Sequence, residues 1–353
     1  MIKISFPHLG NYYIAISYLI KKLTKQEVLV PPKITKKTIE LGSKYSPEFV
    51  CVPFKYNLGN YIESLEQDAN IILQAGGGCR YGYYAELQEK ILRDLGYKFE
   101  FINFMENNKI SIKKIYKFSK KLNKRLNIFN FTYYLLNAFI IILIIDKYEN
   151  KLRLNMGFEL EEGTHEKTHK ELLKELQKDI SLLKLIKINN KYSKKFNDIE
   201  IYKPNNHLKV CLVGELYSLM EPYSSNNIEK KLIKKNIEIK RQTTLTYLLI
   251  TKKFLLKKHI KEGKKYLKYH IGADGTESVV LSYKCAKEKY DGIIHIKSFG
   301  CTPEINAMNI MNIISQEEKI PIIYFSFDSQ DSEVAVNTRI EAFYDMIQSK
   351  KEK

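Results

Sequence analysis

Three of the five cysteines in this 353-residue chain stand in loops shaped by glycine or proline. Cys51 precedes Val-Pro, Cys79 follows three glycines, and Cys301 precedes Thr-Pro. Each is expected at the end of a short apolar strand, where the loops of a parallel sheet converge. Cysteine sulfur holds iron–sulfur clusters, and three protein ligands leave one iron of a cubane open to an outside ligand. No compact C-x₂-C motif is present, so three isolated cysteines are the competing interpretation.

The other two cysteines are expected to be structural. Cys211 lies inside an apolar strand pattern and Cys285 inside a predicted helix over 277–290, where cysteine packs as a small hydrophobic residue. An odd number of cysteines in a chain of this length argues against a disulfide framework. The N-terminus has no secretory signal pattern. We therefore expect a cytoplasmic protein whose cysteines are reduced or bound to metal.

Three polar residues follow predicted strands and are candidate catalytic residues. His8 and Asn11 follow the first strand, and Glu215 follows the strand that contains Cys211. Residues at strand ends of a parallel sheet commonly line a site. Each of the three is equally well interpreted as a helix cap or as a loop hydrogen-bonding residue.

Residues 165–169 read His-Glu-Lys-Thr-His and match the H-E-x-x-H zinc motif. On a helix the two histidines would share one face, with Glu166 as the base. Gly163 and three acidic residues surround its start, so we expect the motif on an exposed helix N-terminus. No third ligand is evident in the sequence. A chance match in a charged helix is the favoured interpretation.

Two further motifs are interpreted as structural. The glycines at 76–78 lie between a predicted strand and a predicted helix, where backbone amides can cradle a phosphate. They lack the Lys-Ser/Thr of a P-loop and do not match G-x-G-x-x-G, so we predict a tight turn and no ATP binding. Asp274, Glu277 and Ser278 are interpreted as caps of a helix that begins near Thr276.

The chain is strongly basic, with 58 Lys and Arg against 40 Asp and Glu and a net charge of +18. Residues 109–125 and 252–268 are Lys-rich and carry the spacing of amphipathic helices. Such charge is typical of proteins that bind nucleic acid or anionic cofactors. No helix-turn-helix, RNP or zinc-finger motif accompanies it. A solvated surface is the favoured interpretation, and a nucleic-acid-binding module is kept as an alternative.

The longest apolar run covers residues 131–145. At ~1.5 Å per residue it would form a helix of roughly 22 Å, shorter than the ~30 Å hydrocarbon core of a bilayer. It contains Asn137 and ends at Asp146-Lys147. We predict a buried helix and no membrane span, with a membrane-contacting segment as the minority interpretation.

Strand and helix patterns divide the chain into three parts. We predict an N-terminal α/β lobe over 1–103, a helical insertion over 104–205 and a C-terminal α/β lobe over 206–353. The first lobe has strands at 2–6, 28–30, 71–74 and 99–103 and helices at 11–23 and 82–95. The second has strands at 208–214, 237–240, 292–297 and 321–328 and helices at 227–235 and 333–348. This alternation predicts two Rossmann-like lobes with parallel sheets.

Several peptides, in order along the chain, resemble the acyl-CoA dehydratase activase-related proteins. These are relatives of the 2-hydroxyglutaryl-CoA dehydratase D-component, in the 2-hydroxyacyl-CoA dehydratase superfamily. The peptides are FPHLGNYY, PPKITKKTIELGSKYSPEFVCVPFK, CRYGYYAELQEKILRDLGY, FGCTPEI and DSQDSEVAVNTRIEAFYDMI. The resemblance is weakest over 104–200. Two positions depart from the family pattern: Gly78 stands in place of proline, and Asp274 stands in place of histidine.

The resemblance implies a two-lobed α/β protein with one [4Fe–4S] cluster between the lobes, held by Cys51, Cys79 and Cys301. In the dehydratases, which are lyases, a separate ATP-hydrolysing activase of the actin/Hsp70 fold supplies an electron at very low potential. A CoA thioester is thereby reduced to a ketyl radical and loses its hydroxyl group. The implied function is one-electron reduction of a small substrate, with a CoA thioester as the candidate. An accessory electron-transfer or cluster-carrying subunit is the alternative.

Overall fold

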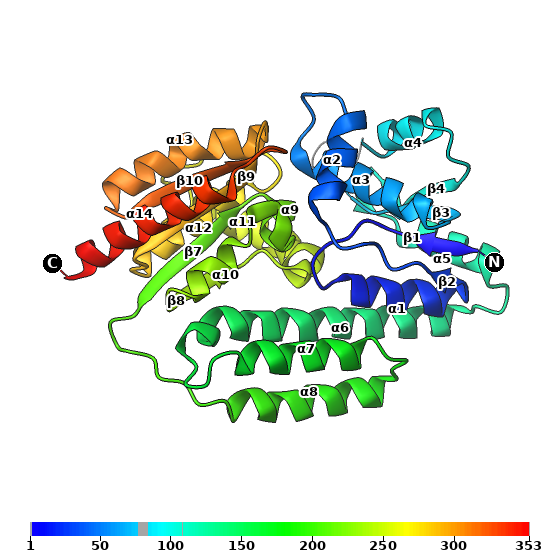
Figure 1. The fold of residues 1–353 in the computed structure, drawn as a ribbon, viewed down its shortest axis with the longest axis horizontal. Coiled ribbons are helices and arrows are strands. Elements are labelled where there is room, and N and C mark those ends of the chain that lie inside the picture. The colour runs from blue at the N-terminus through cyan, green and yellow to red at the C-terminus, as the bar shows by residue number, and fades with distance from the viewer. Residues whose placement is uncertain (1, 77–83, 108, 353) are drawn as a thin grey trace. The chain divides into compact units, whose positions relative to one another are not determined.

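The computed structural model describes residues 2–76, 84–107 and 109–352. The chain forms two compact units. Unit 1 comprises Met1–Ile142 and Leu176–Leu185, and unit 2 comprises Leu143–Glu175 and Ile186–Lys353. Each unit contains a four-stranded parallel sheet (Figure 1). The predicted α/β class with two parallel sheets is therefore confirmed.

The sheet of unit 1 has the strand order β2-β1-β3-β4. Ile4 of β1 pairs with Val28 on one side and with Ile71 on the other. Its strands lie within two residues of their predicted bounds. They are β1 (Lys3–Ser5), β2 (Glu27–Val28), β3 (Ile71–Gln74) and β4 (Glu100–Asn103).

The sheet of unit 2 has the order β10-β9-β7-β8. Its strands also match their predicted ranges closely: β7 (Leu208–Gly214), β8 (Ile237–Arg241), β9 (Gly292–Ser298) and β10 (Ile322–Phe327). In chain order both sheets follow one plan, with the first strand between the second and the third, and the fourth at the edge beside the third. The strand order therefore reverses between β1 and β3 in unit 1 and between β7 and β9 in unit 2, the positions where ligands bind in open α/β sheets.

The helices of unit 1 include two that the sequence patterns did not predict. They are α2 (Lys36–Tyr45) and α3 (Val52–Glu66). These helices touch backbone to backbone, because a Cβ on Gly42 would stand 1.8 Å from the Lys55 carbonyl oxygen. The other helices are α1 (Tyr13–Thr24), α4 (Tyr84–Asp94) and α5 (Ile112–Leu122), and a hairpin pairs β5 (Met105–Glu106) with β6 (Lys109–Ile110).

Two helices are divided between the units well inside their length, α6 (Ile128–Asn155) and α8 (Leu182–Asn197), and a third boundary falls before the last residue of α7. Unit 2 also contains the 3₁₀ helices η2 (Met156–Phe158) and η3 (Pro222–Ser225) and a π-helix, η4 (Tyr247–Thr251). Its remaining helices are α7 (Thr164–Leu176), α9 (Leu216–Met220), α10 (Ile228–Ile233), α11 (Lys252–Glu262), α12 (Gly275–Lys287), α13 (Thr302–Glu317) and α14 (Glu333–Glu352).

The sheet of unit 2 is buried on both faces, as expected for a parallel sheet. Along β7, Val210 and Leu212 enter one core cluster, while Cys211 and Val213 enter the other. Cys211 also forms a disulfide with Cys285 of α12 inside that second cluster. The expectation that these two cysteines are separate, reduced core residues is therefore wrong. A residue inside a strand and one inside a helix come together only when the helix packs on the sheet.

Helix α6 is longer than the apolar run that predicted it. It has 28 residues and continues past Asp146, whose carboxylate accepts a hydrogen bond from the Thr246 amide at 2.9 Å. Farther along, Arg153 is buried and lies 3.5 Å from the Glu229 carboxylate. The helical segment Ile128–Phe158 is long and apolar enough to cross a membrane, and 39% of its most apolar 18-residue stretch is buried. The prediction of a short, buried helix was wrong in length and in the extent of burial.

The H-E-x-x-H motif lies at the start of α7, but its histidines are not exposed as predicted. His165 is 1% exposed and His169 is 7% exposed. Nδ1 of His165 lies 2.7 Å from the Glu159 carboxylate, and the same carboxylate accepts the His165 backbone N–H. Burial lowers the pKa of His169. Both histidines are part of the packing of α7, and Glu159 acts as an acceptor at its first turn.

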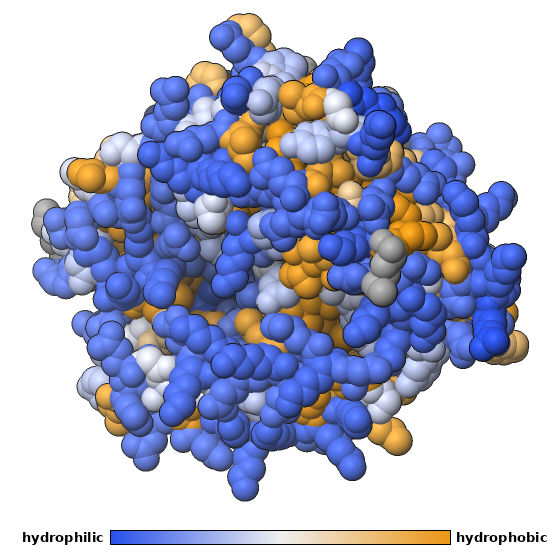
Figure 2. Space-filling view, turned by 45° about the vertical axis from the view of Figure 1, so that its right-hand side comes forward, coloured by the Kyte–Doolittle hydropathy of each residue, from blue (hydrophilic) through white to orange (hydrophobic). Residues whose placement is uncertain are grey.

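Figure 2 shows that hydrophilic side chains predominate on the face of the molecule that it presents. Hydrophobic side chains gather there in separate patches between the hydrophilic ones.

Candidate functional site

Three helices of unit 2 begin at residues with chemically active side chains. Glu215 directly follows β7 and is the N-cap of α9. Asp274 is the N-cap of α12, and Cys301, which follows β9, is the N-cap of α13. The Asp274 carboxylate accepts the backbone N–H of Leu216 in α9 at 3.2 Å, and a Cβ on Gly275 of α12 would stand 2.5 Å from the Pro303 carbonyl oxygen of α13, so the starts of the three helices lie together and form one site. This site lies where the strand order reverses between β7 and β9.

Glu215 is buried and serves as a helix cap. One carboxylate oxygen accepts the Tyr217 backbone N–H at 2.8 Å. The other accepts the Ser218 backbone N–H at 3.0 Å and the Ser218 hydroxyl at 2.7 Å. Burial raises the pKa of Glu215 to about 7, and the nearby Asp274 carboxylate acts in the same direction. Glu215 can therefore hold or release a proton near neutral pH.

Cys301 is half-buried beside two carboxylates. Burial raises the pKa of its thiol, and Glu215 and Glu304 raise that pKa further. The backbone N–H of Glu304 points at the sulfur and opposes this effect. The free thiol therefore keeps its proton at neutral pH.

Strand β9 adds two buried basic side chains to this site. Nε2 of His295 lies 2.7 Å from the Glu304 carboxylate, and both side chains are buried. Lys297 is 4% exposed, and burial lowers its pKa while Cys301 and Glu304 act in the opposite direction. Within the described part of the chain, the Lys297 amine has no hydrogen bond and no ion pair. Lys297 was not predicted as a site residue, although a lysine inside a mostly apolar strand is a usable signal.

A second lysine, Lys252, pairs with two acidic residues at the start of α12. Nζ of Lys252 lies 2.7 Å from the Asp274 carboxylate and 3.3 Å from the Glu277 carboxylate. The other Asp274 oxygen accepts the Leu216 backbone N–H at 3.2 Å. Asp274 thus occupies the predicted cap position but bonds to α9 and α11 in place of its own helix. Glu277 faces Lys252, and Ser278 is buried, so the predicted capping by these side chains was wrong.

Cys51 has the same local arrangement as Cys301, in unit 1. It is the N-cap of α3 with proline at the second helical position, as Pro303 is in α13. Both cysteines are partly exposed. Turns after α2 precede Cys51, so its predicted place at the end of a strand was wrong. Cys79 and most of the glycine loop before it lie outside the described residues.

His8 and Asn11 follow β1, as predicted. The His8 backbone N–H donates to the Asn60 side chain of α3 at 2.8 Å, and the His8 ring stacks on Tyr13 at 5.6 Å between centroids. His8 is buried, and Asn11 lies in the turn that opens α1, where its carbonyl accepts the Ile14 N–H. Both residues therefore belong to the carboxyl edge of the unit 1 sheet.

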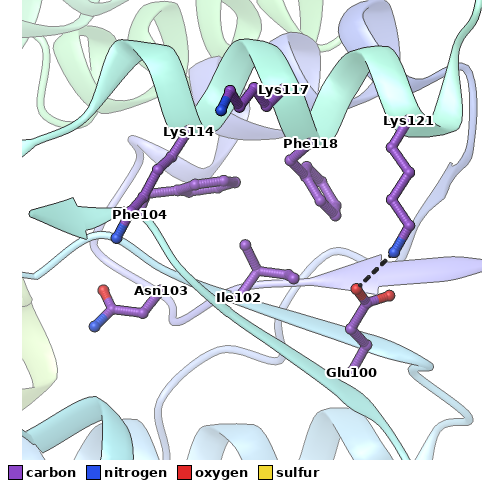
Figure 3. Close-up of a pocket in the computed structure, with 8 residues that line it drawn as sticks. All are labelled: Glu100, Ile102, Asn103, Phe104, Lys114, Lys117, Phe118 and Lys121. Carbon is purple, nitrogen blue, oxygen red and sulfur yellow. Dashed lines mark hydrogen bonds and ion pairs between the residues drawn. The ribbon is translucent and has the colours of Figure 1, made fainter.

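A separate cavity lies between β4 and α5 in unit 1 (Figure 3). It has a volume of about 320 Å³, and the rings of Phe104 and Phe118 line it. Two lysines on its α5 side already have protein partners. Lys121 pairs with Glu100 at 3.1 Å, and Lys114 donates to the Met105 carbonyl at 2.8 Å. These contacts make the cavity a less suitable anion site than the presence of its lysines alone would indicate.

Among residues 2–76, 84–107 and 109–352, no three His, Cys, Asp or Glu side chains lie close enough together to hold a metal ion. This set of residues does not include Cys79. No protein-family model matches the chain, and no curated protein is significantly similar to it in sequence.

Proposed function

We propose that the chain is an iron–sulfur protein of the 2-hydroxyacyl-CoA dehydratase superfamily, with Rossmann-like lobes, in which Cys51, Cys79 and Cys301 ligate one [4Fe–4S] cluster. The observation that carries the proposal is the shared setting of two of these cysteines. Cys51 and Cys301 are each a partly exposed helix N-cap followed by X-Pro. The other two described cysteines are joined to each other in the core.

A helix N-terminus is a suitable place for a thiolate ligand. Its free backbone N–H groups and the positive end of the helix dipole stabilise negative charge on sulfur. α3 and α13 have 15 and 16 residues, so each presents a full helix dipole. The raised pKa of Cys301 means that a metal must displace a proton from this thiol. Metal loading is then expected to release protons and to weaken at low pH.

When bound, a [4Fe–4S] cluster would supply one-electron transfer. The residues around Cys301 suit a reaction that generates negative charge on a small substrate. The Lys297 side chain is 4% exposed, and its amine has no hydrogen-bond partner among the described residues, so it can donate to an anionic oxygen. Glu215, with its pKa at about 7, can return a proton to the substrate.

The proposal includes an electron donor and a substrate class. The donor is an ATP-hydrolysing activase of the actin/Hsp70 fold, and the substrate is small, with a CoA thioester as the candidate. An accessory subunit that carries the cluster without substrate chemistry is the second candidate. Lys297 and Glu215 favour the enzyme, because a cluster carrier needs neither a proton store nor a donor for an anionic oxygen.

The test is anaerobic purification followed by iron and sulfide analysis. We expect bound iron and sulfide with broad visible absorbance, and loss of most of both in Cys51→Ser and in Cys301→Ser. The matched control is the double variant Cys211→Val/Cys285→Ala, which removes the disulfide cysteines and should keep the iron. Circular dichroism checks that each variant is folded. Iron-free wild-type protein, or full iron content in Cys301→Ser, would overturn the proposal.

A further inference from the structure

The beginnings of α6 and α8 expose a group of large apolar side chains in unit 1. Phe129 is 82% exposed and Leu183 is 72% exposed, well above the usual exposure of such residues. Ile128, Tyr133 and Leu136 are also exposed. We call these five residues the α6–α8 tip.

The α6–α8 tip is a contiguous surface. The Tyr133 hydroxyl accepts the Leu182 backbone N–H at 3.2 Å, which places the second turn of α6 beside the start of α8. Phe129, Tyr133 and Leu136 are spaced by four and three residues, so they share one face of α6. On another face of α6, Phe131 packs into a core cluster with Leu23. The core packing of α6 and its hydrogen bond to α8 therefore hold the tip in place.

Basic residues flank the tip. Lys124 and Arg125 precede α6, and Lys178 and Lys184 lie on either side of the start of α8; all four are exposed. None of them has an ion-pair partner within the described part of the chain. The one acidic residue in these two segments, Asp179, is paired with Lys22. The apolar tip thus has a positive rim.

We propose that the α6–α8 tip inserts into the surface of an anionic lipid bilayer. Protruding aromatic and aliphatic side chains with a basic rim match the boundary between acyl chains and anionic headgroups. A second copy of the chain would bring the same positive rims together, which disfavours self-association. A protein partner would need pockets to receive side chains as exposed as Phe129 and Leu183, whereas a bilayer accommodates them without complementary shape.

The contact is with the membrane surface. The polar residues in the second half of α6 have protein partners: Asp146 bonds to the Thr246 amide, and Arg153 pairs with Glu149 and Glu229. Passage of α6 across a bilayer would break these contacts and bury the charges in hydrocarbon. The inference does not depend on the proposed iron–sulfur function.

The test is sedimentation with phosphatidylcholine vesicles that contain or lack phosphatidylglycerol. We expect binding only to the anionic vesicles, and binding that persists at about 0.5 M salt, where charges are screened beyond a few Å. The double variant Phe129→Ser/Leu183→Ser should lower the affinity by at least ~10-fold because it removes the inserted apolar surface. The matched control is Phe254→Ser/Val334→Ser, which removes two side chains of similar exposure, 75% and 73%, from α11 and α14.

Three results would overturn the proposal. Equal loss in the two double variants would show that the tip is not the contact. Complete release of the wild-type protein by salt would show that net charge alone drives binding. Absence of vesicle binding, together with a dimer in sedimentation velocity that Phe129→Ser/Leu183→Ser dissociates, would identify a second copy as the occupant.

Discussion

The Nε2 atom of His295 and a carboxylate oxygen of Glu304 lie 2.7 Å apart, and neither side chain is more than 1% exposed. This bond joins the middle of β9 to the first turn of α13. Cys301 is the N-cap of the same helix, so the bond also fixes the position of the thiol relative to the sheet. A buried pair of this kind is costly to break on one side only, because the remaining partner is left without compensation.

Replacement of Glu304 with alanine is therefore expected to lower the free energy of unfolding by about 1–3 kcal/mol, because the buried His295 ring loses its hydrogen-bond partner. Glu317→Ala, at the other end of α13, is the control. Glu317 is 46% exposed on its side chain and pairs with Lys265 at the surface, where such pairs contribute about 1 kcal/mol or less. Urea denaturation measures both variants. Equal stability of the two would contradict the role assigned to the His295–Glu304 bond.

The close contact of α2 and α3 predicts a severe effect of one added methyl group. A Cβ on Gly59 would stand 1.9 Å from the Thr38 carbonyl oxygen, which is backbone and cannot rotate away. Gly59→Ala should lower the free energy of unfolding by about 3 kcal/mol or more, because the helices must move apart. Glu40→Ala on the exposed face of α2 serves as the control and should change it by less than about 1 kcal/mol. A fully stable Gly59→Ala protein would show that the two helices do not meet in this way.

The raised pKa of Glu215 predicts a pH dependence of stability. The folded protein binds a proton at this carboxyl up to about pH 7, whereas the unfolded chain releases it near the ordinary value of 4.5. The folded state thus binds more protons between these values, so stability falls as pH rises through this window. Glu215 alone should account for about 3 kcal/mol of this decrease.

Glu215→Gln should remove that part of the decrease. The measurement is urea denaturation of both proteins at pH 5 and pH 8. The two proteins share all their other titrating groups, so the difference between their free energies of unfolding reports Glu215. The variant should gain stability relative to the wild type at pH 8 but not at pH 5. A constant difference between the two proteins at both pH values would mean that Glu215 titrates normally.

The two carboxylates beside Cys301 also predict its reactivity. In reduced, metal-free protein at pH 8, Glu215→Gln should lower the pKa of the Cys301 thiol, because one of the charges that raises it is gone. A larger thiolate fraction reacts faster with iodoacetamide. Mass spectrometry of the labelled peptides follows the rate, with Cys51 of unit 1 as the internal control. An unchanged rate at Cys301 would show that the Glu215 charge does not raise the pKa of this thiol.

The disulfide predicts a labelling pattern. After unfolding in denaturant without reductant, iodoacetamide should modify Cys51, Cys79 and Cys301 but neither Cys211 nor Cys285. Reductant should make all five cysteines reactive. The bond closes a loop with a sequence separation of 74, for which chain entropy gives a stabilisation of about 4 kcal/mol. Labelling of Cys211 without reductant would show that the bond does not form in the purified protein.

Strand patterns predicted both sheets because buried parallel strands are short runs of β-branched and aromatic residues between turn signals. The run Ile71–Gln74 and the run Leu208–Gly214 were located to the residue. Helix α3 was missed for the opposite reason. It is buried on nearly every side, so it has no polar stripe, and both Pro53 and Gly59 resemble loop residues in the sequence.

The site was predictable only in part. Glu215 and Cys301 could be found because each directly follows a strand pattern, and strand ends converge in this type of sheet. The Cys211–Cys285 bond could not, since it depends on which helix covers β7. Nor could the burial of Lys297, His295 and Glu304 as one group, because it depends on the packing of α13 against β9.

The division of α6 and α8 between the units has a consequence for biosynthesis. Unit 1 ends its first stretch at Ile142 and is completed only by Leu176–Leu185, where Asp179 pairs with Lys22 and Gln177 bonds to Tyr13. Residues 143–175 must therefore be synthesised before unit 1 can complete its fold. The nascent chain cannot complete the fold of unit 1 before synthesis of unit 2 has begun. A chain truncated after Ile142 would contain an incomplete unit 1, which cellular proteases would cleave readily.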